Sequence, residues 1–163
     1  MDYVLRHATP EDAEAVVLMH TLAHEESYGH LLSPHFFAAR RKAIPERVDR
    51  RRPYLEGPGP RILALDANNE LVGLADAGTG REDDPPAPLE LYSIFVLNRA
   101  QGNGLGQALL SAALGDSPAY LWVLEANVRA QSFYRRQGFR LDGARGVLPS
   151  EWENVPELRM VRD

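Results

Sequence analysis

The sequence has 163 residues, 44% of them hydrophobic and 25% charged, which is the composition of an ordinary soluble globular protein, and its length predicts a single domain over residues 1–163. Its formal net charge of −5 weighs against a general nucleic-acid-binding function, because such proteins are usually basic. The chain has no cysteine, no apolar run long enough to cross a membrane and no signal-peptide pattern at its start, so we expect a cytoplasmic protein without disulfides, thiolate zinc ligands or a cysteine nucleophile.

The first third of the chain is predicted to form one strand and two helices. Residues 3–7 alternate in polarity, which favours a strand. The segment Thr9-Pro10-Glu11-Asp12 has the composition of a helix start: a capping threonine, a proline whose missing N–H costs nothing there, and two acids near the positive helix end. Ser33-Pro34 repeats this signal, and Pro45 should kink or end the second helix.

A basic run occupies the end of this second helical region. Two interpretations of it are open. It is either the solvated face of a helix and its exit, or a patch that attracts an anionic substrate or the phosphates of a cofactor. Its members are Arg40, Arg41, Lys42, Arg47, Arg50, Arg51 and Arg52.

The rest of the chain alternates between strands and helices, which indicates an α/β fold. Residues 78–88 are acidic and turn-rich, and we expect them to form a surface loop between strands. Gly138 should stop the last helix, because glycine readily adopts the left-handed backbone that ends one. Strands are predicted over 61–65, 71–77, 89–96, 120–124, 139–144 and 157–161, and helices over 104–114 and 127–137.

A glycine-rich turn, Gln101-Gly102-Asn103-Gly104-Leu105-Gly106, joins the strand over 89–96 to the helix over 104–114. Glycine lets the backbone approach a ligand closely, and a helix start adds unpaired N–H groups with a partial positive charge. The turn therefore predicts a phosphate-binding cradle that needs no lysine.

Two other phosphate-binding motifs fit this turn poorly. A nucleotide P-loop requires a Lys-Ser/Thr pair after its last glycine, whereas Gln107-Ala108 follow Gly106 here. A dinucleotide-binding fingerprint requires Gly or Ala three residues after its second glycine, and this chain has Gln107 there. On the glycines alone, a tight turn without a ligand stays open.

The turn also matches a third kind of motif. Gln101-x-x-Gly104-x-Gly106 resembles the Gln/Arg-x-x-Gly-x-Gly/Ala motif of the GNAT N-acetyltransferase superfamily, and residues 121–139 resemble its second CoA-binding segment. The resemblance is strongest over 89–139. It implies the acyl-CoA N-acyltransferase fold, with a mixed, mostly antiparallel central sheet flanked by helices, and acetyl-CoA as co-substrate. The second segment matches at Leu121-Trp122-Val123-Leu124, Asn127, Ala130, Phe133-Tyr134 and Gly138-Phe139.

The same resemblance implies which residues contact acetyl-CoA. Asn127 would contact the CoA arm. Tyr134, two helical turns further along the same face, would protonate the leaving thiolate as general acid, while Phe133 would stay in the core. Main-chain groups at the end of the preceding strand would bind pantetheine and stabilise the oxyanion, at Ile94, Phe95 and Val96. The pyrophosphate would be held by Gln101, Gly102, Asn103, Gly104, Leu105 and Gly106.

Glu90 is the predicted general base for the acceptor amine. It is a carboxylate in an otherwise apolar strand, so burial should raise its pKa, and it stands where histone-type family members carry their catalytic glutamate. A solvent-facing Glu90 is the alternative. Trp122 occupies the position of the base in the ribosomal-protein alanine acetyltransferases, which argues against that branch's catalytic arrangement.

The first two helices are where this family usually builds its acceptor pocket, and they contain four histidines: His20, His24, His30 and His35. No convincing third ligand accompanies His20 and His24, so we expect no metal. Solvent-facing or hydrogen-bonded histidines are expected, with His24 or Glu25 open as a substrate contact. Trp152 could either wall the acceptor site or simply pack.

The resemblance implies an N-acetyltransferase that moves the acetyl group of acetyl-CoA to a primary amine of a small molecule or of a peptide or protein. Two alternatives stay open: a CoA-binding module of the same fold without activity, and a nicotinamide dinucleotide enzyme, which Gln107 disfavours. We expect no metal, nucleic-acid or membrane partner. The acceptor and a homodimer stay open.

Overall fold

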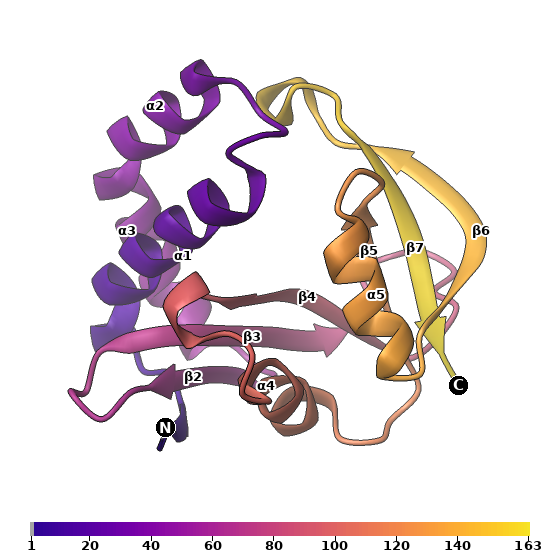
Figure 1. Cartoon of the computed structure of the whole chain (residues 1–163), viewed down its shortest axis with the longest axis horizontal. Helices are drawn as coiled ribbons and strands as arrows, with labels where there is room; N and C mark the ends of the chain where they lie inside the picture. Colours follow the sequence, from indigo (N-terminus) through magenta and orange to yellow (C-terminus); the bar gives the residue numbers. More distant parts are fainter. Residues whose placement is uncertain (1) are drawn as a thin grey trace.

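A seven-stranded sheet organises the computed structural model, which describes residues 2–163 (Figure 1). The strand order is β1-β2-β3-β4-β5-β7-β6, and every neighbouring pair is antiparallel except β4 and β5. This confirms the predicted mixed, mostly antiparallel sheet. The strands are β1 (Val4–His7), β2 (Arg61–Leu65), β3 (Leu71–Thr79), β4 (Leu89–Val96), β5 (Ala119–Leu124), β6 (Arg140–Val147) and β7 (Pro156–Arg162).

Helices cover both faces of this sheet, as predicted, because side chains alternate between faces along each strand. Ile62 and Ala64 of β2 join the cluster under α4, whereas Leu63 and Leu65 pack with α1 on the other face (Figure 1). The helices are α1 (Ala13–Tyr28), α2 (Pro34–Lys42), α3 (Ile44–Glu56), α4 (Leu105–Leu114) and α5 (Val128–Arg136). Within residues 2–163, none has both the length and the hydrophobicity of a membrane-spanning helix.

The helix starts differ from the sequence-based expectation at two places. The predicted opening at residues 9–12 is a short 3-10 turn, Pro10–Asp12, in which the Thr9 N–H donates to the Asp12 carboxylate at 2.8 Å before α1 begins. Pro45 neither kinks nor ends the second helix. α2 already stops at Lys42, and Pro45 lies in the first turn of α3, where its missing N–H breaks no hydrogen bond.

The only parallel pair in the described sheet, β4 with β5, is also its shortest contact. Leu89–Leu91 pair with Ala119–Leu121, and no pairing continues beyond them. At Tyr92 the register of β4 against β3 slips by one residue, which is a β-bulge, and a bulge bends its strand. β5 meanwhile pairs along its whole length with β7. The two strands therefore diverge after Leu91 and Leu121, and an opening forms between them.

Candidate active site

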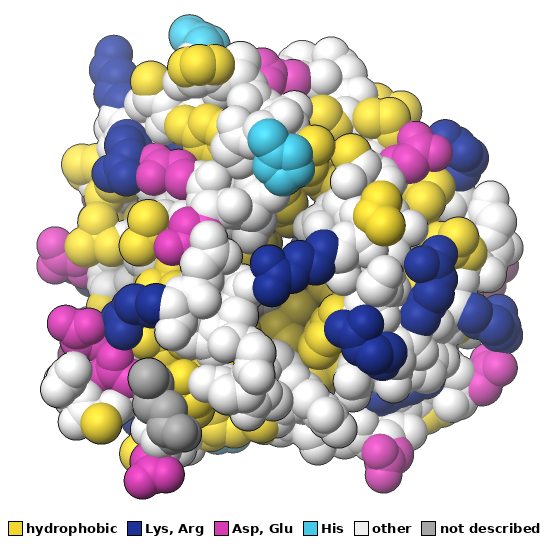
Figure 2. Space-filling view, in the orientation of Figure 1, with side chains coloured by type: hydrophobic (Ala, Val, Ile, Leu, Met, Phe, Trp, Pro, Cys, Tyr) yellow, Lys and Arg dark blue, Asp and Glu magenta, His cyan; other side chains and the backbone are white. Residues whose placement is uncertain are grey.

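A cleft with a volume of about 1080 Å³ lies in the opening between the diverging strands β4 and β5. Its walls are the end of β4, the end of β5, the glycine-rich turn with the start of α4, one face of α5 and residues of α1. Figure 2 shows the hollow near the centre of the view, with an apolar floor and Lys or Arg side chains at its rim. Arg129 and Arg136 of α5 are among the basic residues that line it.

The glycine-rich turn forms one end of the cleft. Gly102 and Gly104 both have φ of +84°, a left-handed conformation that glycine adopts without strain, and an added Cβ would meet nothing at either position. Gly106 has another role, because a Cβ there would lie 3.3 Å from the Phe133 ring and would push α4 away from α5. Within the described residues, the N–H groups of Gly106 and Gln107 have no backbone acceptor, so the start of α4 can receive an anion.

Two polar side chains of the turn hold its shape. Gln101 donates through Nε2 to the Val96 carbonyl at 2.8 Å, which fastens the turn to the end of β4. Asn103 donates through Nδ2 to the Tyr3 hydroxyl at 2.6 Å and accepts from the Leu105 N–H at 3.3 Å. Asn103 is absent from the cleft wall, unlike the other predicted turn residues. Its side chain therefore shapes the turn from outside.

Ile94, Phe95 and Val96 line the cleft from β4. They pair with Ala75, Leu74 and Gly73 of β3. They do not pair with β5, because the pairing of β4 with β5 ends at Leu91. One backbone edge of this segment thus lacks a strand partner and borders the cleft. Such an edge can offer N–H and C=O groups to an extended ligand, apart from the Val96 carbonyl, which already accepts from Gln101.

α5 brings Asn127 and Tyr134 to the same cleft, as their spacing predicts. The Asn127 carbonyl oxygen caps α5 by accepting from the Ala130 N–H at 3.2 Å. Tyr134 is 8% exposed, and its hydroxyl makes no hydrogen bond within residues 2–163. Burial, with a smaller contribution from Tyr28, raises the pKa of Tyr134 well above its ordinary value. The phenol stays protonated at neutral pH and can act as a proton donor. Phe133 packs on the core and also borders the cleft.

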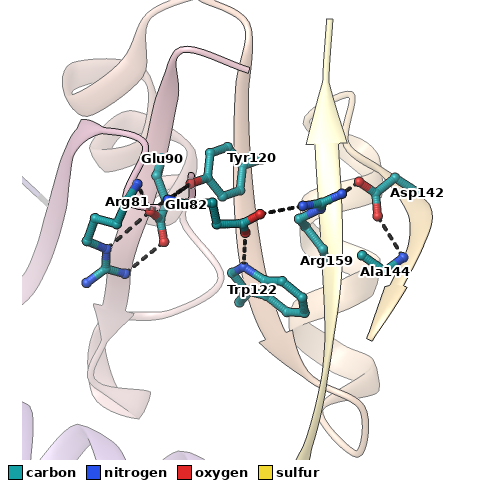
Figure 3. A network of polar contacts seen from close by, with 8 residues as sticks. All are labelled: Arg81, Glu82, Glu90, Tyr120, Trp122, Asp142, Ala144 and Arg159. Carbon is teal, nitrogen blue, oxygen red and sulfur yellow. Dashed lines mark hydrogen bonds and ion pairs between the residues drawn. The ribbon is translucent and has the colours of Figure 1, made fainter. Parts of the chain in front are cut away.

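Glu90 does not have the raised pKa that the sequence predicts. Burial at 3% exposure does favour the neutral acid, but hydrogen bonds from Arg81, the positive charge of Arg81 and a hydrogen bond from Tyr120 outweigh it and lower the pKa of Glu90 (Figure 3). The Arg81 guanidinium lies 2.8 Å from one carboxylate oxygen, and the Tyr120 hydroxyl donates to the other at 3.0 Å. Glu90 is also absent from the cleft wall.

Glu157 of β7 is a carboxylate in the cleft that the sequence analysis did not single out. It pairs with Leu124 of β5, three residues beyond Leu121, where the pairing of β5 with β4 ends. Burial raises the pKa of Glu157, and the nearby charges of Glu90 and Glu82 raise it further. No other described residue hydrogen-bonds its carboxylate. No local pattern could have revealed it, since only the long-range pairing of β5 with β7 brings it here.

The loop between β3 and β4 closes the side of the cleft near Glu157. Glu82 accepts a hydrogen bond from the Trp122 indole N–H at 2.7 Å and forms an ion pair with Arg159 of β7 (Figure 3). Arg159 in turn reaches Asp142 of β6 at 2.7 Å. The loop is therefore tied to β5 and β7, and it carries Arg81 into the cleft wall.

Aromatic side chains surround the end of the cleft opposite the glycine turn. The His24 ring lies 4.8 Å from Phe95, 5.2 Å from Trp152, 5.3 Å from Tyr28 and 4.2 Å from His20, measured between ring centroids. Trp152, like His20 and His24, lines the cleft. The sequence left Trp152 open between wall and packing, and it does both.

The two central histidines differ: His20 has a hydrogen bond with Arg51 at its Nδ1, as expected, whereas His24 is neither solvent-facing nor hydrogen-bonded at its Nδ1, contrary to the expectation. His24 is 4% exposed, and its Nδ1 has no partner in the described chain. Burial, with nearby arginines, lowers the pKa of His20 to about 3 and holds the pKa of His24 well below its ordinary value, so both rings are neutral. His30 borders the cleft and His35 does not. Glu25 is held by Arg41 at 2.6 Å, away from the cleft wall. Residues 2–163 contain no group of three His, Asp or Glu that could hold a metal ion.

Comparison with known proteins gives consistent matches over most of the chain. A family model described as the acetyltransferase (GNAT) family matches residues 26–139. A probable N-acetyltransferase of Mycobacterium tuberculosis is 24% identical over 161 residues, which cover 94% of this chain and 90% of that protein.

Two of the similar solved structures contain a bound coenzyme, coenzyme A in one and AcCoA in the other. The PaiA N-acetyltransferase from Thermoplasma acidophilum, solved in complex with coenzyme A, matches with a TM-score of 0.70 and 16% identity, covering 100% of this chain and 99% of that one. A phosphinothricin acetyltransferase from Sinorhizobium meliloti, in complex with AcCoA, matches with a TM-score of 0.70 and 21% identity, covering 99% and 88%. At sequence identities this low, the matches show that the folds are similar.

Proposed function

Because the chain belongs to the acetyltransferase (GNAT) family, we propose that it transfers the acetyl group of acetyl-CoA to a primary amine of a small molecule or of a peptide or protein. The observation that carries the proposal is the single cleft that unites an anion-receiving helix start, a protonated tyrosine and an unpartnered carboxylate. Structures of similar fold that contain CoA or AcCoA support the choice of donor. We further propose that residues 1–163 act as one cytoplasmic domain.

The donor would lie along the opening between β4 and β5. Its pyrophosphate would accept hydrogen bonds from the free N–H groups of Gly106 and Gln107, with Gly102 and Gly104 giving the turn its shape. The pantetheine arm would follow the unpaired edge of residues 94–96, and we propose that the thioester would lie between Tyr134 and Glu157, which both line the cleft.

The reaction needs two proton transfers. The amine nitrogen attacks the thioester carbon once its proton has passed to a base, because an alkylammonium with a pKa of roughly 10.4 is almost wholly charged at neutral pH. N–H groups of the β4 edge would stabilise the oxyanion. As the C–S bond breaks, Tyr134 would give its proton to the CoA sulfur and later recover one from solvent.

We assign the base role to Glu157 rather than Glu90. Glu157 borders the cleft, has no hydrogen-bond donor of its own among the described residues and has a raised pKa, all of which suit a group that must take up a proton. Glu90 is already occupied by Arg81 and Tyr120. Glu90 as the base stays a competing prediction.

An acceptor screen tests the function directly. Acetyl-CoA would be incubated with amines of different classes, and the release of free CoA thiol would be followed, with Tyr134→Phe as the matched control. Amine-dependent release that the variant slows supports the proposal. If acetyl-CoA binds but no amine of any class releases CoA, the chain is an inactive CoA-binding module. A rise in melting temperature with NADH but not with CoA would indicate the dinucleotide enzyme instead.

A further inference from the structure

Arg40 of α2 is a half-buried guanidinium without a hydrogen-bond acceptor. Its Nε is fully enclosed and unpartnered, and no described carboxylate or carbonyl accepts from the rest of the group. The guanidinium lies 5.0 Å from the Trp152 ring and 5.6 Å from the Phe36 ring. Ring faces stabilise a cation, but they accept no strong hydrogen bond, so the enclosed Nε–H of Arg40 stays unsatisfied.

Two further arginines of α3 approach Arg40. Arg47 donates to the Thr21 hydroxyl at 2.6 Å, and burial together with the charges of Arg40, Arg51 and Arg50 lowers its pKa to about 10. Arg51 lies 3.4 Å from Nδ1 of His20 and 3.5 Å from the Asp76 carboxylate. We call Arg40, Arg47 and Arg51 the arginine cluster.

The arginine cluster lacks counter-ions. Within residues 2–163, Asp76 is the one carboxylate paired with any of its members. Three acids of the surrounding helices are paired with other arginines, in the pairs Glu25 with Arg41, Glu46 with Arg50 and Asp49 with Arg52. The basic run thus divides in two. Arg41, Lys42, Arg50 and Arg52 form its solvated face, and the arginine cluster turns inward.

The cluster adjoins the aromatic end of the cleft, although none of its three members lines the cleft itself. Trp152, which contacts Arg40, and His20, which contacts Arg51, both line the cleft. Nε2 of His20 and Nδ1 of His24, beside them, are enclosed and unpartnered. Donors without acceptors and positive charges without counter-ions are costly when desolvated, and a bound anion would relieve both costs.

We propose that the arginine cluster binds an anionic group of the acceptor, so that the acceptor is an amine that also carries a carboxylate or phosphate. This rests on the proposed function. The amine would then lie toward Glu157 and the thioester, while the anion lies against Arg40 and Arg51. A neutral amine of the same shape would leave the cluster unsatisfied and would bind less tightly.

Matched acceptors test the proposal. Free amino acids and the corresponding amino acid amides would be compared by the rate of CoA thiol release, in the parent, in Arg40→Gln and in Arg50→Gln, an exposed arginine of the same region. We expect kcat/KM at least about tenfold higher for the carboxylates in the parent and in Arg50→Gln, with this preference lost in Arg40→Gln. Equal rates for acids and amides in the parent, or a preference that survives Arg40→Gln, would overturn it.

A binding measurement tests the arginine cluster independently of the proposed acetyltransferase activity. Inorganic phosphate, at constant ionic strength, should raise the melting temperature of Gly104→Asp, in which a carboxylate would occupy the place proposed for the pyrophosphate, but not that of a variant that carries both Gly104→Asp and Arg40→Gln. Equal rises in these two variants would contradict the proposal. Arg40→Gln itself should fold, because its guanidinium makes no hydrogen bond in the parent. A phosphate effect that disappears in Gly104→Asp and persists in Arg40→Gln would refute the cluster as the site, whether or not any amine is acetylated.

Discussion

At the scale of single residues, burial raises the pKa of both proposed proton-transfer groups, Tyr134 and Glu157, with a different consequence for each. Tyr134 is enclosed by α5 and the core, which disfavours the phenolate and keeps the proton that a leaving thiolate would need. Glu157 is half-buried, and its burial together with the charges of Glu90 and Glu82 outweighs the opposing charge of Arg81, so its carboxylate gains affinity for a proton without losing access to the cleft. A proposed proton donor, Tyr134, and a proposed proton acceptor, Glu157, therefore border the same cleft.

Tyr134→Phe removes the proton donor and leaves the ring in place. We expect turnover to fall by roughly ten- to a thousand-fold, within the usual range for general acid catalysis, while acetyl-CoA affinity changes little. Steady-state kinetics with thiol detection and a binding titration would measure the two effects. Phe133→Leu is the matched neighbour, expected to weaken α4–α5 packing and not the chemical step. Unchanged turnover in Tyr134→Phe would assign the tyrosine to packing alone.

Glu157→Gln and Glu90→Gln separate the two candidate bases. If Glu157 accepts the amine proton, its replacement should lower kcat/KM by roughly a hundredfold or more near neutral pH, and the loss should shrink toward the pKa of the amine, where more acceptor is already neutral. In the parent, the rate should fall as pH drops through the raised pKa of Glu157. If Glu90→Gln is instead the slower of the two variants, and its loss of kcat/KM is the one that shrinks toward the pKa of the amine, Glu90 is the base.

Glu90 should instead contribute to stability. Its folded-state pKa lies below the ordinary value of 4.5, so the stabilisation is present above about pH 4.5 and is lost as pH falls through the folded-state pKa. Glu90→Gln should therefore lower the urea midpoint at neutral pH and flatten the acid limb of the stability profile. A variant as stable as the parent at neutral pH would mean that the Arg81–Glu90–Tyr120 contacts contribute nothing measurable.

At the scale of elements, the cleft exists because a bulge in β4 and the pairing of β5 with β7 pull two parallel strands apart. The glycine turn then starts α4 at the edge of that gap. Backbone conformation, more than side-chain chemistry, builds this part of the site.

Gly104→Asp should abolish the rise in melting temperature that acetyl-CoA produces, because a carboxylate would occupy the place proposed for phosphate. Gly115→Asp is the control, since Gly115 also has positive φ and open surroundings but stands at the far end of α4. Both variants should lose some stability from backbone strain, and only the first should lose the acetyl-CoA effect. Equal responses to acetyl-CoA in the two variants would remove the phosphate assignment.

At the scale of the whole molecule, the contacts of Glu82 join the half of the sheet ending in β4 to the half formed by β5, β7 and β6 (Figure 3). Glu82→Gln would leave Arg159 with Asp142 alone, and we expect a loss of about 1–3 kcal/mol in the free energy of unfolding. Glu46→Gln, in the exposed pair with Arg50, should change it by less than about 0.5 kcal/mol. Urea denaturation of both variants measures the difference, and equal losses would show that the contacts do not couple the two halves.

The sequence by itself determined the family, the glycine turn and the order of the strands and helices, except for the division of the predicted second helix into α2 and α3. These features depend on local patterns: alternating polarity, helix-start signals and two short motifs. Only the tertiary structure decided the electrostatics. Arg81 and Tyr120 reach Glu90 from a loop and from β5, and they reverse the shift that burial alone would cause. The pairing of β7 with β5 brings Glu157 to the cleft, and the packing of α2 and α3 against α1 turns three arginines inward. A pKa depends on every charge and dipole around a group, and those neighbours come from distant parts of the chain.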